Sequence, residues 1–337
     1  MKMKKAKDIK PNPLVSLIIV THNHTHLLPR LLDSILAQSF KQLEVIIVDD
    51  CSDIPCDEVV EAYAARGLDL HLIRCPTHIL TRAARLTGVK AARADIIAFA
   101  DADDILWGTD ALAHHVELMQ KTGAEVVHFR SVLVDDDMNF SAYCANHDPF
   151  ALELEGAEIF RRFLLAKMPG APTWTKLYAK ALWEKILPIA ERSAVNRHLE
   201  DSYLTTLLFF HMRRYVSSER LGYAHHLVGR RPERDAGRAV DAYLILRELT
   251  PYFRAEECPE DVLQLFISQM NEELCMFMGR FCQQLTPMDG FEIMDEELSA
   301  KLHGADPELF FKALLLGNRM NALKITGCLR TIYSTPK

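Results

Sequence analysis

Four short apolar segments alternate with helix-like segments over the first hundred residues, and this alternation constrains the fold more than any other feature. The expected strands are residues 15–20, 43–48, 70–73 and 96–100. Short apolar runs rich in β-branched residues are typical of strands buried on both faces of a sheet. The segments between them, expected to be helical, are residues 26–38, 57–66 and 81–92. The βαβαβαβ order predicts a parallel, doubly wound α/β sheet.

The pattern becomes less regular after residue 104. We expect a helix at 109–121 and a strand at 125–134, then short mixed elements to residue 215. The change of composition at residues 229–237 (GRRPERDAG) predicts a linker. Further helices are expected at 239–253, 261–285 and 306–322. The domain prediction is therefore a flexible basic tail at 1–12, an α/β domain at 13–231 and a helical C-terminal region at 232–337.

Composition excludes several classes of protein. The 337 residues include 39 basic and 46 acidic side chains, a formal net charge of −7, so a nucleic-acid backbone is not the expected partner. With 49% hydrophobic residues the chain is too apolar to be disordered. No apolar run reaches the roughly 18 residues that cross a bilayer. Eight scattered cysteines without a C-x-x-C pair indicate reduced thiols, and we expect a cytoplasmic protein.

Polar residues directly follow three of the expected strands, namely Thr21–Asn23, Asp49–Ser52 and Asp101–Asp104. Ligands of such sheets gather at the carboxyl ends of the strands. Helix capping and turn formation explain Asp50 and Ser52 equally well, and that alternative stays open. Three carboxylates within residues 101–104 repel one another unless a cation lies among them. A hard divalent ion, Mg²⁺ or Mn²⁺, is expected there.

Five segments carry a resemblance to a known family. They are SLIIVTHN (16–23), EVIIVDDCSD (44–53), AARLTGVKAARADIIAFADADD (83–104), WTKLYAKALW (174–183) and HLEDSYLTTLLF (198–209). In this order they resemble the family 2 glycosyltransferases with a GT-A fold, of the bacterial surface-polysaccharide type. The resemblance implies a Rossmann-like mixed sheet at 13–231, followed by a helical appendage. It also implies metal-assisted, inverting transfer of a sugar from a nucleotide-diphospho-sugar to a saccharide or lipid-linked saccharide acceptor, with Mn²⁺ or Mg²⁺.

The resemblance also assigns roles to individual residues. The donor-binding positions that it implies are Thr21, His22, Asn23, Asp49, Arg82, Arg85 and Asp101. Asp103, the second carboxylate of the D-x-D motif, would hold the metal, and Asp201 would be the catalytic base, with a helix N-cap as the alternative role. Trp174, Lys176 and Glu200 would border the acceptor. Cys51 occupies a position where the family usually has glycine, and His22 one where tyrosine is common.

Three further features have weaker explanations. The stretch His22, His24 and His26 resembles a metal cluster, but the chain is expected to turn there from strand to helix, which disperses the three rings. His226, Arg230 and Arg231 lie where the family often closes over the diphosphate, although a core or surface role explains them as well. The basic residues after Glu308 suit a peripheral membrane contact or a homodimer through the C-terminal helices. Packing against the α/β domain is the favoured alternative.

Other functions remain as rivals. A nucleotidyltransferase also uses a metal-binding carboxylate pair, but a glycine-rich basic loop is expected after its first strand, and THNHTHLLPR has no glycine. A non-catalytic nucleotide-sugar-binding or scaffold protein has no need to retain Asp101, Asp103 and Asp201 together. A dehydrogenase is disfavoured because no G-x-G-x-x-G follows the first strand.

Overall fold

The computed structural model describes residues 12–144, 148–149, 151–166, 171–195, 198–226 and 234–284. In chain order the elements are β1 (Val15–Thr21), α1 (Leu28–Leu36), β2 (Leu43–Asp49), α2 (Asp57–Ala65), β3 (Leu70–Arg74), α3 (Leu80–Ala91), β4 (Ile96–Asp101), β5 (Ile105–Leu106), α4 (Ala111–Thr122), β6 (Val126–Val134), β7 (Phe140–Tyr143), β8 (Glu153–Glu155), α5 (Glu158–Leu165), η2 (Thr173–Thr175), β9 (Lys176–Ala179), α6 (Lys180–Ala190), α7 (Glu200–His211), β10 (Arg214–His226), α8 (Arg234–Ala255) and α9 (Glu260–Gln284). The predicted helix at 306–322 and residues 1–11 of the predicted tail lie outside the described residues.

The chain forms two compact units that interleave along the sequence. The first comprises Met1–Ile159, Pro169–Glu191 and Leu208–Leu227, and the second comprises Phe160–Met168, Arg192–Leu207 and Val228–Lys337. The boundaries of the predicted domains stay a prediction.

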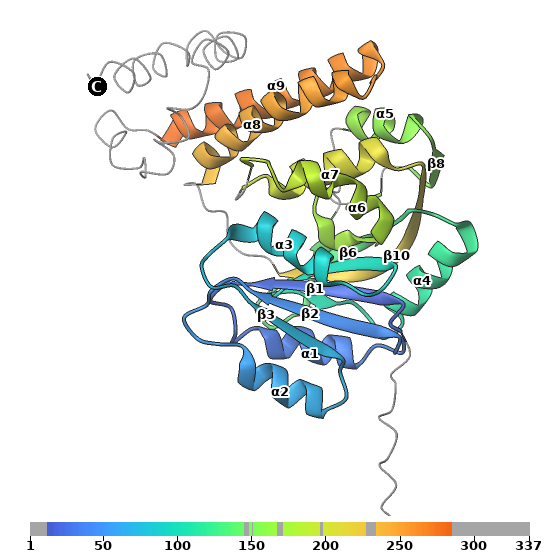
Figure 1. Ribbon diagram of the computed structural model, residues 1–337, viewed down its shortest axis with the longest axis vertical. Helices are drawn as coiled ribbons and strands as arrows, with labels where there is room; N and C mark the ends of the chain where they lie inside the picture. The colour runs from blue at the N-terminus through green and yellow to red at the C-terminus, as the bar shows by residue number, and fades with distance from the viewer. Residues whose placement is uncertain are drawn as a thin grey trace, which may run out of the picture. The chain divides into compact units, whose positions relative to one another are not determined.

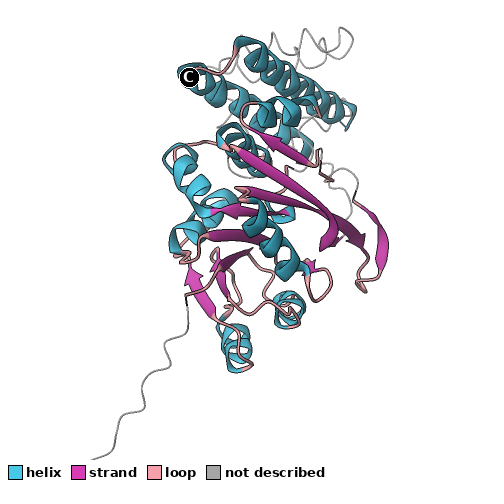
Figure 2. Cartoon of the chain, turned by 90° about the vertical axis from the view of Figure 1, so that its right-hand side faces the viewer, coloured by secondary structure: helices cyan, strands magenta, loops and turns pink. Residues whose placement is uncertain are grey.

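A mixed sheet organises the first unit, with the strand order β3-β2-β1-β4-β9-β6-β10-β5. Strands β3, β2, β1 and β4 are parallel, as the βαβαβαβ pattern predicts. The antiparallel strand β9 joins β4 to β6, and β10 runs parallel to β6. Figure 2 shows these strands in one twisted layer. The predicted fold class, a Rossmann-like mixed sheet followed by helices, is confirmed.

Alternate residues of β1 pack on opposite faces of the sheet. Leu17 and Ile19 belong to the same core cluster as Leu28 and Leu32 of α1. Ile18 faces the other way, since successive side chains of a strand alternate. On that face α3 lies so close that a Cβ at Gly88 would come within 2.4 Å of Ile18 Cγ2. Helices α1 and α2 accordingly lie on one side of the sheet and α3 on the other (Figure 1).

The strand β10 was not among the expected elements. It is 13 residues long, and its pairing with β6 shifts register between Ser218 and Leu221 and again between Leu221 and Tyr223. Such bulges break the two-residue alternation by which strands are identified from sequence. This unpredicted strand turns out to support the candidate site.

The described residues of the second unit are mainly helical. Phe160 of α5, Phe253 of α8 and Phe266 of α9 are buried, and ring centroids lie 5.2 Å apart for Phe160–Phe253 and 5.1 Å apart for Phe253–Phe266. The helices expected at 239–253 and 261–285 correspond to α8 and α9. None of the helices in the described ranges is both long and apolar enough to cross a membrane.

The linker predicted at 229–237 is wrong for its last four residues, because α8 begins at Arg234. Glycine lowers helix propensity, so Gly237 favoured a linker. The position is nevertheless helical and crowded: a Cβ at Gly237 would lie 2.2 Å from the ring of His198. Tertiary packing therefore explains this glycine.

Candidate active site

The carboxyl ends of the parallel strands bring three of the predicted donor-site residues to one edge of the sheet. Thr21 is paired in register with Asp49, and Val20 with Asp101. Asp49 is in turn paired with Arg74 of β3. Thr21 and Asp49 are buried, whereas Asp101 is partly exposed. An acidic edge at the end of an otherwise apolar sheet results.

Hydrogen bonds tie the loops after β1 and β2 together. The His22 Nδ1–H donates to the Asp50 carbonyl oxygen at 2.8 Å, and the Asn23 N–H donates to Ser52 Oγ at 2.9 Å. Asn23 and Cys51 both have left-handed backbone, with φ of 59° and 64°. Non-glycine residues in this region cost conformational energy, and such strain concentrates at functional sites.

The adjacent carboxylates Asp49 and Asp50 have different partners. Asp49 Oδ1 accepts a hydrogen bond from the Ser52 N–H at 2.9 Å, and its Oδ2 lies 3.6 Å from Arg74 Nε. Asp50 accepts the N–H groups of Ile79 and Leu80 at 2.7 and 2.9 Å, where α3 begins. The capping alternative is confirmed for Asp50. The donor-binding role of Asp49 stays a prediction.

The three histidines of the H-x-H-x-H stretch have different surroundings. The ring of His22 packs against that of His78, which precedes α3, with centroids 4.1 Å apart and the ring planes tilted by 32°. His24 and His26 instead form an edge-to-face pair at 6.4 Å. These contacts agree with the expectation that a strand-to-helix turn separates the rings. His78, which the sequence did not single out, lies with His22 at the candidate donor site.

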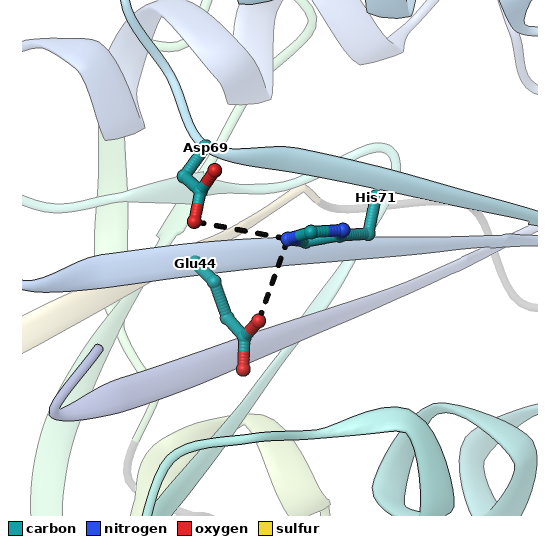
Figure 3. Close-up of side chains that lie close together, drawn as sticks. All are labelled: Glu44, Asp69 and His71. Carbon is teal, nitrogen blue, oxygen red and sulfur yellow. Dashed lines mark ion pairs between the residues drawn. The ribbon is translucent and has the colours of Figure 1, made fainter. Parts of the chain in front are cut away.

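A different cluster has the spacing of a metal site but already contains a guanidinium. Glu44, Asp69 and His71 converge at the opposite, amino-terminal end of β2 and β3 (Figure 3). Arg93 lies among them, with its Nε 2.7 Å from Glu44 and its Nη2 2.9 Å from both Asp69 and His71 Nε2. Because a guanidinium supplies the positive charge, this cluster is an ion-pair network.

Two arginines of α3 are buried near the acidic edge. Arg85 Nη2 lies 3.1 Å from Asp101 Oδ1, so this predicted diphosphate-binding residue is held by the first carboxylate of the D-x-D motif. Arg82 hydrogen-bonds the Ala190 carbonyl oxygen of α6. The structure thus places Arg85 in direct contact with another predicted donor residue, Asp101.

The D-x-D motif forms a tight turn at the end of β4. The Asp104 N–H donates to the Asp101 carbonyl oxygen at 3.1 Å, and Arg30 donates to the Asp103 carbonyl oxygen at 2.5 Å. Among the described residues the Asp103 carboxylate makes no hydrogen bond or ion pair. An unengaged carboxylate beside a second one is a suitable donor set for a hard divalent ion, which binds one or two carboxylates and completes its shell with phosphate or water oxygens. The residues therefore fit Mg²⁺ or Mn²⁺.

Asp104 connects this turn to β10. Its fully buried carboxylate accepts hydrogen bonds from the Tyr223 hydroxyl at 2.7 Å and the His226 N–H at 2.8 Å, and His225 Nδ1 lies 3.2 Å away. Burial raises the pKa of Asp104 to about 6. Burial of the His225 ring opposes its protonation, yet the hydrogen bond and charge of Asp104 raise the His225 pKa overall.

The two predicted acceptor-side residues of the first unit are both buried. The Trp174 ring stacks on Tyr223 and His225, with centroids 4.6 and 5.0 Å away. Lys176 Nζ donates to the Pro172 carbonyl oxygen at 2.8 Å. Trp174 thus extends the group around Asp104. An acceptor role for these two residues stays a prediction.

The predicted base, Asp201, lies in the second unit, in the first turn of α7 beside the buried Glu200. Immediately before this turn, the His198 and Leu199 N–H groups donate to Asp241 Oδ2 of α8, at 2.8 and 3.1 Å. Asp201 and Glu200 are therefore at a helix start that another helix holds. Arg230 and Arg231 lie outside the described residues, and His226 Nε2 contacts Asp136 at 2.7 Å.

Tyr223 and Asp104 are residues that sequence reasoning missed or left without a role. Asp104 was visible as the third carboxylate after β4. Tyr223 could have been found only through an alternating pattern in β10, which the bulges of that strand conceal.

Comparisons with known proteins point to one family. The family model described as glycosyl transferase family 2 matches residues 16–186, half of the chain. The uncharacterized glycosyltransferase EpsJ of Bacillus subtilis is 37% identical over 92 residues, which are 27% of this chain and 26% of that protein. The amylovoran biosynthesis glycosyltransferase AmsB of Erwinia amylovora is 33% identical over 108 residues, 32% of this chain and 36% of that one. The chain thus spans well under half of the length of these curated relatives.

Solved structures show the same fold. S. aureus TarS 1-349 in complex with UDP-GlcNAc has a TM-score of 0.58 and 20% identity, covering 89% of this chain and 81% of that one. Mannosyltransferase PcManGT from Pyrobaculum calidifontis, in complex with GDP-Man and Mn²⁺, has a TM-score of 0.53 and 17% identity, covering 98% and 90%.

Proposed function

The chain belongs to glycosyl transferase family 2, and on that premise we propose that it transfers a sugar from a nucleotide-diphospho-sugar to a saccharide or lipid-linked saccharide acceptor. The observation that carries the proposal is the acidic edge, where Asp49 and Asp101 flank β1, paired with Thr21 and Val20, and Asp103 follows in the next turn. The names of relatives add support, since AmsB is a biosynthetic glycosyltransferase and TarS was solved with UDP-GlcNAc. Surface-polysaccharide assembly is the proposed setting.

The donor would bind along the edge formed by β1, β2 and β4. In this proposal Thr21, His22, Asn23 and Asp49 contact the nucleoside, and Asp101 contacts the ribose. Arg85, held by Asp101 at 3.1 Å, and Arg82 supply positive charge toward the diphosphate. A bound Mn²⁺ or Mg²⁺ ion, held by Asp103, would stabilise the negative charge that grows on the leaving diphosphate.

The acceptor hydroxyl requires a base on the face of the sugar opposite the leaving group. We assign this role to Asp201, which would accept the hydroxyl proton as the oxygen attacks the anomeric carbon. One base opposite one leaving group produces single displacement with inversion. Trp174, Lys176 and Glu200 would border the acceptor. In this scheme residues 13–231 form the catalytic GT-A domain, and residues 232–337 the helical region.

The proposed place of action is the cytoplasm. The proposal also includes a peripheral membrane contact or a homodimer through the basic C-terminal stretch. That stretch lies outside the described residues.

The decisive experiment separates donor binding from transfer. Thermal-shift measurements with Mn²⁺ and UDP-, GDP-, dTDP- and CMP-sugars should identify a stabilising donor. With that donor, Asp201→Asn should retain the thermal shift, while its rate of sugar transfer falls by about 10²–10⁴-fold. The neighbouring variant Glu200→Gln should retain more of the transfer rate. Full activity in Asp201→Asn removes Asp201 as the base. A donor that binds but is never transferred or hydrolysed favours a nucleotide-sugar-binding protein.

A further inference from the structure

One face of α8 contacts the segment that leads into α7. Gly237, Asp241 and Glu248 are spaced by four and seven residues, so they project from the same side of the helix. All three contact residues between 194 and 199, which immediately precede Glu200 and Asp201. These residues all belong to the second unit.

Asp241 makes the most specific of these contacts. Its Oδ2 accepts two backbone hydrogen bonds, from the His198 N–H at 2.8 Å and the Leu199 N–H at 3.1 Å. The Leu199 carbonyl oxygen in turn accepts the Tyr203 N–H at 2.9 Å, so Leu199 is the N-cap of α7. A carboxylate at this end of a helix interacts favourably with the helix dipole and with unpaired N–H groups.

Burial of the Asp241 carboxylate costs free energy. Asp241 is 0% exposed, and its Oδ1 has no hydrogen-bond partner among the residues that the structure describes. A buried carboxylate with one unpaired oxygen carries a desolvation penalty that an apolar side chain in α8 would avoid. What the carboxylate adds is a defined position for the two backbone groups that start α7.

Two other contacts restrict the same segment. Glu248 Oε1 accepts the Ala194 N–H at 3.0 Å, so α8 contacts the chain at Ala194 as well as at His198 and Leu199. Gly237 lies so close to the His198 ring that a Cβ there would come within 2.2 Å of it. Ala194, His198 and Leu199 are thus each restrained from α8, by hydrogen bonds and, at His198, also by close packing.

We propose that Asp241 is a positioning residue for transfer: from α8 it fixes the start of α7 and thereby the direction of the Asp201 carboxylate. The inference rests on the proposed function, in which Asp201 is the base. It gives the helical region a role in catalysis, because the helix that follows the α/β sheet sets the geometry of a residue in an earlier helix. Displacement of a base by about 1 Å can cost two orders of magnitude in rate.

The test compares two replacements of Asp241, one that removes its hydrogen-bond acceptors and one that keeps an acceptor. Asp241→Leu keeps the shape but accepts no hydrogen bond, whereas Asp241→Asn keeps one acceptor oxygen. In Asp241→Leu, kcat should fall at least about tenfold while the affinity for the stabilising nucleotide-sugar with Mn²⁺ stays within about twofold. Asp241→Asn should recover most of kcat. Glu260→Leu, which removes an exposed carboxylate from the start of α9, is the matched control and should behave as wild type.

Amide hydrogen exchange reports the structural step independently of activity. Peptides covering residues 198–204 should exchange faster in Asp241→Leu, with exchange in β1, β2 and β4 unchanged. Should Asp241→Leu fail to fold, Glu248→Leu loosens the other end of the same segment and carries the same expectation. Wild-type kcat in a folded Asp241→Leu, or unchanged exchange at 198–204, overturns the inference.

Parallel measurement of Asp201→Asn separates the two possible failures. Loss of transfer in Asp201→Asn together with wild-type kcat in Asp241→Leu refutes the positioning role alone. Retained transfer in Asp201→Asn refutes the assignment of the base, and the positioning role with it.

Discussion

The hydroxyl group of Tyr223 links the two ends of the D-x-D turn. It accepts a 2.9 Å hydrogen bond from the Asp101 N–H and donates a 2.7 Å hydrogen bond to the carboxylate of Asp104. Because Tyr223 is itself fully buried in β10, a strand more than a hundred residues away in sequence sets the position of the predicted metal-binding turn.

Tyr223→Phe removes both hydrogen bonds without changing the ring. A buried N–H and a buried carboxylate each lose a partner, so the free energy of unfolding should fall by about 1–3 kcal/mol. The affinity for the donor with Mn²⁺ should fall as well, because the turn is less well held. Urea unfolding and donor titration measure the two effects. Tyr63→Phe, which loses a 2.8 Å hydrogen bond to the Pro29 carbonyl oxygen, should lose stability alone. Unchanged donor affinity in Tyr223→Phe would contradict the prediction.

Asp103→Asn tests the proposed metal ligand. The amide replaces an oxygen ligand that carries charge with a neutral group, so the metal-dependent part of nucleotide binding should weaken by an order of magnitude or more, about 1.4 kcal/mol. The measurement is the shift in the protein's unfolding temperature on addition of the nucleoside diphosphate, once with Mn²⁺ and once with EDTA. Asp137→Asn, an exposed carboxylate of the β6–β7 turn, is the control. An equal Mn²⁺ dependence in Asp103→Asn and wild type excludes Asp103 as a ligand.

Cys51→Gly should stabilise the protein. Cys51 has a φ of 64°, a left-handed conformation that costs an L-residue about 1 kcal/mol and costs glycine little. The free energy of unfolding should rise by up to about 1 kcal/mol in Cys51→Gly. Cys51→Ala retains the Cβ and therefore the strain, so its stability should stay near that of wild type. Equal stabilities of the glycine and alanine variants would show that backbone strain is not responsible.

The buried His115 should make stability depend on pH. Burial lowers the pKa of His115 to about 3, and its ring stacks on Phe129 with centroids 4.4 Å apart. The unfolded chain takes up a proton near pH 6.5 and the folded chain does not, so this stability is present above pH 6.5 and is lost as pH falls toward 3. Between pH 7 and 5 the loss should be about 2 kcal/mol. His115→Phe should flatten the urea-unfolding profile by that amount. Parallel profiles for the two proteins would contradict the assignment.

Much of the acidic edge could be predicted from sequence. A buried parallel strand has a continuous apolar pattern, and polar residues end it, so the carboxyl ends of β1, β2 and β4 were recognisable. Because parallel strands align these ends, the sequence alone predicts that Thr21, Asp49 and Asp101 lie at one edge of the sheet. The capping of α3 by Asp50 could not be decided in the same way. Its carboxylate caps residues 79 and 80, far along the chain, and only the fold shows that contact.

The sequence by itself determined that the first four strands are parallel, which residues end them and the family to which they point, because these depend on local polarity and spacing. Only the tertiary structure decided that Tyr223 and Asp104 hold the D-x-D turn and that Asp241 holds the start of α7. These contacts join residues 119 and 43 positions apart in the chain. No local pattern encodes them, since each partner is an ordinary polar residue until folding buries it and leaves one hydrogen-bonding group within reach of another.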